Sequence, residues 1–138
     1  MRVIVDSSVL LRKLFGEPEP LAEWSSIVEA YASRILLVEV GRVIDRCRLE
    51  GRVDDEQVAH LHQEAHRILR SIDLIELTNT ILERAATAMP TVLGSLDALH
   101  LVTALELRRS SGKPLAVATH DRQLARAARA SGFTVYGA

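Results

Sequence analysis

Residues 2–8 read Arg-Val-Ile-Val-Asp-Ser-Ser, a short apolar run that ends in one carboxylate and two hydroxyls. The β-branched residues 3–5 are typical of a buried strand. Asp6 or Ser7 can cap a helix that starts directly after this strand. Ligands of open α/β sheets bind beyond the carboxyl ends of the strands, so Asp6 lies where chemistry is usually done.

The rest of the chain alternates between strand-like and helix-like segments. Apolar runs predict further strands at residues 30–32, 72–77, 115–119 and 133–136. Apolar periodicity and caps predict helices near residues 7–15, 20–28, 33–50, 54–70, 78–89, 95–109 and 121–130. This alternation predicts the α/β class: a three-layer α/β/α sandwich with a central parallel sheet.

The composition is that of an ordinary globular domain, with 48% hydrophobic and 25% charged residues over 138 positions. A chain of this length is expected to form one domain.

The net charge of −1 hides an excess of arginine, since lysine occurs only at positions 13 and 113. Arginine favours planar contacts to phosphate, although a GC-rich genome gives the same bias. One cysteine excludes an internal disulfide, and no long apolar run or charged leader is present, so we expect a soluble cytoplasmic protein.

Four carboxylates are candidates for a shared site. Asp6 and Asp121 each follow an apolar strand, and right-handed crossovers bring those strand ends to one rim of the sheet. Taken singly, both are explained as helix N-caps. Asp97 alone is explained as a first-turn acid that suits the helix dipole, and Glu39 as the partner of an arginine on its own helix.

Together these acids need a counter-charge. Carboxylates within about 5 Å of one another repel by roughly 3 kcal/mol per pair at an effective dielectric of 20. Protons or metal ions must offset such repulsion in a marginally stable fold. Ligand sets made only of oxygen favour Mg²⁺ or Mn²⁺ over Zn²⁺. These ions bind phosphate and activate water, so the pattern indicates phosphodiester hydrolysis.

Four blocks of the sequence resemble the signature of PIN-domain nucleases: VIVDSS at residues 3–8, VEVGR at 38–42, LDALHL at 96–101 and THD at 119–121. Their order, their intervals and the size of the chain are similar to VapC-type toxins of bacterial toxin–antitoxin pairs. The resemblance runs from Met1 to the final strand. It implies one PIN-like nuclease domain over residues 1–138 that cleaves RNA.

The resemblance also implies roles for particular residues and partners. One or two Mg²⁺ or Mn²⁺ ions would be held by the four acids, Asp6, Glu39, Asp97 and Asp121. Ser7 and Thr119 match the hydroxyl positions of the family, which orient the acids or the water. A VapB-like antitoxin peptide or helix and a homodimer are the expected protein partners.

Several residues around this site are less firmly defined by the sequence. We expect RNA contacts from the pocket arginines Arg42 and Arg46, and His120 is either an RNA contact or an exposed loop histidine. His100 lies three residues after Asp97 and could approach the metal; the other interpretation is a partly buried residue whose ring bonds a backbone carbonyl. Gly41 lies inside a predicted helix, where close approach of another backbone would explain it.

Two other functions remain open from the sequence alone. The same chemistry could serve RNA processing without an antitoxin, and a neighbouring antitoxin gene would distinguish the two roles. A catalytically silent PIN-fold binding module is the third possibility. Loss of one or more acids would be its expected mark, and all four acids are present.

Overall fold

The computed structural model describes residues 1–138 and contains one five-stranded parallel sheet. The strand order is β3-β2-β1-β4-β5. The strands are β1 (Arg2–Val5), β2 (Glu29–Ser33), β3 (Ile72–Ile75), β4 (Ala116–Ala118) and β5 (Val135–Tyr136). All five predicted strands are therefore confirmed, with bounds that differ by at most a few residues.

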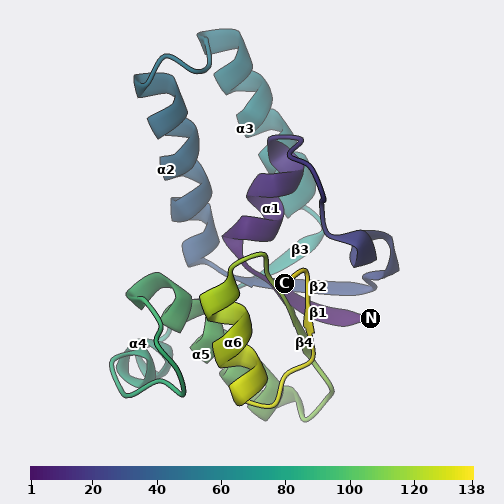
Figure 1. Cartoon of the computed structure of the whole chain (residues 1–138), viewed down its shortest axis with the longest axis vertical. Helices are drawn as coiled ribbons and strands as arrows, with labels where there is room; N and C mark the ends of the chain where they lie inside the picture. Colours follow the sequence, from purple (N-terminus) through teal and green to yellow (C-terminus); the bar gives the residue numbers. More distant parts are fainter.

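Helices link the strands and cover both faces of the sheet (Figure 1). They are α1 (Ser7–Leu14), η1 (Ala22–Ser26), α2 (Ile35–Leu49), α3 (Asp55–Leu69), α4 (Asn79–Ala85), α5 (Ser95–Ser111) and α6 (Arg122–Ala130). Helices α2 and α3 form a hairpin that extends away from the sheet at the top of Figure 1; we call it the helical hairpin. None of these helices is long and apolar enough to cross a membrane.

Side-chain alternation along the strands builds two cores. Val3 and Val5 face a cluster formed with α1, α2 and α3, whereas Ile4 between them faces a cluster formed with α5 and α6. A period of two along a strand sends neighbouring side chains to opposite faces, which explains this division. The predicted three-layer α/β/α sandwich is confirmed.

The predicted helix at residues 20–28 is wrong. The segment forms only the short 3₁₀ helix η1. Leu21 precedes this helix and its side chain cannot cap it. Val28, expected on the buried face, is 82% exposed. The backbone N–H of Val28 donates to the carbonyl of Met1 at 2.8 Å. This bond fixes the chain beside the start of β1 and leads it into β2, so a longer helix cannot form.

The predicted helix at residues 78–89 is too long. Helix α4 is capped by Thr78 as expected, but it ends at Ala85. The hydroxyl of Thr87 donates to the carbonyl of Arg84 at 2.6 Å and closes the last turn before Pro90 is reached. The early end follows from this local side-chain bond.

The explanation offered for Gly41 is also wrong. A Cβ atom built on this residue would meet nothing within 4 Å, so no other backbone approaches it closely. The structure shows no packing reason for glycine at this position of α2.

The strand order places a candidate site at one point of the sheet edge. The order reverses between β1 and β4, which is where open α/β sheets form a crevice beyond their carboxyl ends. Val5 pairs with Ala118, and the N–H of Asp6 donates to the Ala118 carbonyl at 3.2 Å. The two chain segments that follow β1 and β4 therefore leave the sheet side by side.

Candidate functional site

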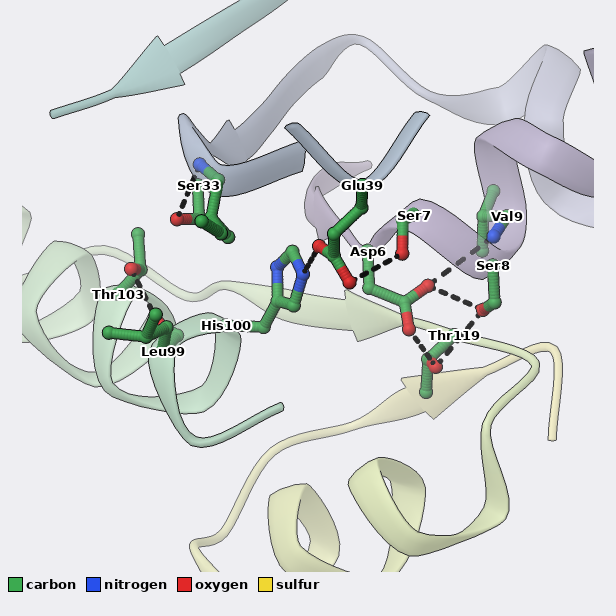
Figure 2. Close-up of polar contacts among 11 residues, drawn as sticks. Asp6, Ser7, Ser8, Val9, Ser33, Glu39, Leu99, His100, Thr103 and Thr119 are labelled. Carbon is green, nitrogen blue, oxygen red and sulfur yellow. Dashed lines mark hydrogen bonds and ion pairs between the residues drawn. The ribbon is translucent and has the colours of Figure 1, made fainter. Parts of the chain in front are cut away.

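Asp6 is the buried centre of the site. Its side chain caps α1 by accepting from the N–H of Val9 at 3.3 Å, and the residue is only 3% exposed. The hydroxyl of Ser8 donates to Oδ1 at 2.5 Å and that of Thr119 donates to Oδ2 at 2.7 Å (Figure 2). Burial raises the pKa of Asp6 above its usual value, although these three hydrogen bonds act in the opposite direction.

The same two hydroxyls tie the segment after β4 to the segment after β1. Thr119 Oγ1 accepts from the N–H of Asp121 at 2.9 Å, and Ser8 Oγ accepts from the N–H of His120 at 2.8 Å. Asp121 itself caps α6, with Oδ1 accepting from the N–H of Leu124 at 2.9 Å. Asp121 is therefore an N-cap, as its position in the sequence allowed, and it also lies directly beside the Asp6 network.

Glu39 reaches the site from α2 and is held on both oxygens. Ser7 donates to Oε2 at 3.1 Å, and Nε2 of His100 lies 2.5 Å from Oε1. Figure 2 shows Glu39 between the imidazole ring and Ser7, with Asp6 beside them. Burial alone would lower the pKa of His100, but the hydrogen bond and charge of Glu39, with the charges of Asp6 and Asp97, raise it.

Asp97 lies in the first turn of α5 and is the fourth acid. Its pKa is raised from 3.8 to about 6, chiefly because the carboxyl is partly buried. The negative charges of Asp121, Asp6 and Glu39 raise this pKa further. The charges of the three other acids therefore act on Asp97, and we call the four residues together the acidic rim.

The acidic rim has the chemistry of a hard-cation site without a finished ligand shell. No group of three or more His, Cys, Asp or Glu side chains is arranged to hold a metal ion. Oδ1 of Asp6 already accepts two hydrogen bonds from the chain, whereas Oδ2 of Asp6 and both oxygens of Glu39 accept one each and can accept a second partner. Oxygen donors and crowded negative charge suit a divalent cation such as Mg²⁺, whose charge would relieve the repulsion that raises the pKa of Asp97.

Of the residues expected to contact RNA, Arg42 and Arg46 lie outside this network, whereas the backbone of His120 belongs to it. Arg42 is exposed and donates to Asp45 at 3.0 Å, whereas Arg46 is exposed with no side-chain partner. His120 is half-buried, and its Nδ1 lies 2.9 Å from the carbonyl of Gly137. The exposed-loop state considered for His120 is therefore wrong, since the ring is packed against the chain end.

Two residues of the site were missed or misjudged from the sequence. His100 is buried and bonds the carboxylate of Glu39, where a backbone carbonyl was expected. Its position three residues after Asp97 on a helix was the available signal, because residues at that spacing share a face. Ser8 holds Asp6 and the segment after β4 together, and its place two residues after a capping Asp was the only hint in the sequence.

Comparison with known proteins gives consistent results. Residues 3–130 match the family described as the PIN domain. The chain is 30% identical to Ribonuclease VapC47 of Mycobacterium tuberculosis over 138 residues, covering 95% of this chain and 93% of that protein. Among solved structures, FitAB bound to the IR36 DNA fragment is similar with a TM-score of 0.71 and 16% identity, covering 96% of this chain and 92% of that one. VapBC2 from Rickettsia felis bound to a promoter DNA fragment gives a TM-score of 0.61 and 12% identity, covering 98% and 97%.

Proposed function

The chain belongs to the PIN-domain family, and on that premise we propose that it is a metal-dependent endoribonuclease, the toxin of a VapBC-type toxin–antitoxin pair. The observation that carries this proposal is the acidic rim, in which the carboxylates of three other segments act on the charge of Asp97. The ribonuclease name of the 30% identical relative supports the reaction and the role as toxin.

We propose that Asp6, Glu39, Asp97 and Asp121 hold Mg²⁺ or Mn²⁺. A divalent ion, when bound, supplies stabilisation of the negative phosphoryl oxygens and activates water for attack on phosphorus. The residues of the chain provide the frame for this chemistry. Thr119 and Ser8 fix the two oxygens of Asp6.

Ser7 and Asp97 have different tasks in this frame. The Ser7 hydroxyl orients Glu39, and the proposed supporting role of Ser7 and Thr119 is therefore to set the directions of two acids. The raised pKa of Asp97, about 6, brings the change of its charge near to neutral pH. A bound cation would favour its ionised form and so restore a full negative charge at this position.

The substrate would be a single-stranded or looped RNA held by arginines around the rim. Arg46 is exposed and free for a phosphate, whereas Arg42 would first have to leave Asp45. Helix α6, which starts directly after Asp121, adds Arg122 and Arg126, exposed on one face with no acidic partner. His120 is also proposed to contact RNA, for which its ring would have to leave the carbonyl of Gly137.

The proposed partners are a VapB-like antitoxin and a second copy of the chain, with residues 1–138 as one cytoplasmic nuclease domain. Solved structures of similar fold contain toxin–antitoxin complexes from Klebsiella pneumoniae and Rickettsia felis. An antitoxin-independent nuclease of RNA processing remains the alternative, and a silent binding module is disfavoured because all four acids are present.

The test is cleavage of a labelled total RNA pool by the purified protein, with Mg²⁺, with Mn²⁺ and with EDTA. We expect metal-dependent cuts that Asp97→Asn reduces more than about a hundredfold, beyond the usual cost of losing an outer partner of a metal ligand. The matched control is Glu64→Gln, which removes an exposed acid of α3 paired only with Arg67. Full activity in Asp97→Asn, or no cleavage by the unmodified protein under any condition, would contradict the proposal.

A further inference from the structure

His100 is a buried side chain that bonds one member of the acidic rim, Glu39, from a different helix. It lies on α5 one helical turn after Asp97, and its Nε2 lies 2.5 Å from Oε1 of Glu39 on α2. An ionised carboxylate only accepts hydrogen bonds, so the ring N–H is the donor. The side chain of His100 is 3% exposed and that of Glu39 is 16% exposed, so water does not compete strongly for this bond.

The contact completes the positioning of Glu39. Ser7, directly after β1, holds Oε2, and His100 holds Oε1. With both oxygens fixed from different elements, the carboxylate plane has one orientation relative to Asp6 and Asp97. Removing the imidazole donor would free one oxygen and let Glu39 rotate about its last side-chain bonds.

A role in fold stability alone does not account for His100. Its Nδ1 is buried and has no hydrogen-bond partner, which is unfavourable for a polar atom. An apolar side chain of similar size would avoid this penalty and fill the same space against Leu101 and the sheet. What histidine provides at position 100, and an apolar side chain would not, is therefore its hydrogen bond to Glu39.

We propose that His100 is a positioning residue that holds Glu39 in the orientation needed to bind the divalent cation. The proposal rests on the metal-dependent function inferred above, but it concerns a residue to which the family resemblance assigned no role. Outer partners of metal ligands orient them, and losing one such partner usually weakens metal affinity or activity by about 10–100-fold.

The experiment measures Mn²⁺ affinity by calorimetry, together with RNA cleavage, on the full chain. His100→Leu fills the space without a donor, whereas His100→Gln places an amide N–H near the position of Nε2. The matched control is Thr103→Val on the next turn of α5, since Thr103 is fully buried and its hydroxyl bonds only the Leu99 carbonyl of the same helix. Unfolding of each metal-free protein reports on stability.

We expect His100→Leu to weaken Mn²⁺ binding by about 10–100-fold, His100→Gln to retain most of it, and Thr103→Val to leave it unchanged. Unchanged Mn²⁺ affinity in His100→Leu would overturn the proposal, and so would equal losses in both His100 variants that follow a loss of stability. The proposed function fails separately if the unmodified protein binds Mn²⁺ but cuts no RNA. An unmodified protein that binds no Mn²⁺ would overturn both.

Discussion

The acidic rim and the helical hairpin hold their polar side chains in opposite ways. In the rim, the buried hydroxyl of Thr119 donates to Asp6, a residue 113 positions earlier in the chain. In the hairpin, exposed arginines bond acids only three residues away, as Arg67 does with Glu64. The polar contacts of the rim therefore join distant parts of the chain, whereas these exposed ion pairs of the hairpin each lie within one helix.

This difference predicts which polar contacts can be removed with little loss of stability and which cannot. An exposed ion pair loses little when it is broken, because water replaces the partner. A buried acceptor that loses its donor keeps its desolvation penalty, so the same chemical change costs far more in the rim. The following predictions test this contrast.

The largest effect on stability is expected for Thr119→Val. Valine keeps the shape but leaves Asp6 Oδ2 without its donor and the N–H of Asp121 without its acceptor. We expect the free energy of unfolding, measured with urea, to fall by about 2–4 kcal/mol. The control Thr103→Val removes an equally buried hydroxyl whose bond stays within one helix, and it should cost clearly less. Equal losses of unfolding free energy in Thr119→Val and Thr103→Val would show that the long-range bonds of Thr119 contribute no more than a bond within one helix.

A smaller effect is expected from pH on the metal-free protein. Folding raises the pKa of Asp97 from 3.8 to about 6, so folding favours its protonated form. The stability that this group contributes is fully present below about pH 4 and is lost as the pH rises through 6, by roughly 1–2 kcal/mol after allowance for solvent screening. Asp97→Asn should therefore show a flatter stability curve between pH 4 and 7 in EDTA. A curve parallel to that of the unmodified protein would contradict this assignment.

The smallest effect is expected in the hairpin. Asp54→Ala removes the cap of α3 and one half of its capping box with Gln57, and it should lower the free energy of unfolding by about 1 kcal/mol. RNA cleavage should not change, because Asp54 lies outside the rim. Arg67→Ala is the comparison within the same helix and should leave the unfolding temperature unchanged. A loss at Asp54 as large as that at Thr119 would show that the hairpin is not locally stabilised.

The same contrast explains which parts of the molecule were predictable from sequence. The helices predicted near residues 7–15 and 54–70 depend on spacing within one segment and were confirmed, and their caps are Asp6 and Asp54. The helix predicted at 20–28 was wrong because the backbone N–H of Val28 bonds the carbonyl of Met1. The helix predicted at 78–89 was too long because the Thr87 hydroxyl bonds the carbonyl of Arg84 and closes the last turn. Neither bond follows from helix periodicity.

The sequence predicted which acids belong to the candidate site, but it did not predict most of the hydrogen bonds that hold them. The placement of Asp6 and Asp121 at one rim followed from parallel strands, and Glu39 and Asp97 were included through the family resemblance. The bond between Glu39 and His100 spans 61 positions and joins two helices, so no local pattern encodes it. The same holds for Ser8, whose partner His120 is 112 positions away.

The pairing of β1 with β4 also sets when the site can exist during synthesis. Ribosomes add about 5–20 residues per second, so Asp6 is made roughly 6–23 seconds before Thr119. Throughout that interval the nascent chain has the first acid but lacks the strand, the hydroxyl and the last acid that surround it. The acidic rim is therefore completed only after nearly the whole domain has left the ribosome, and an unfinished chain has only part of it.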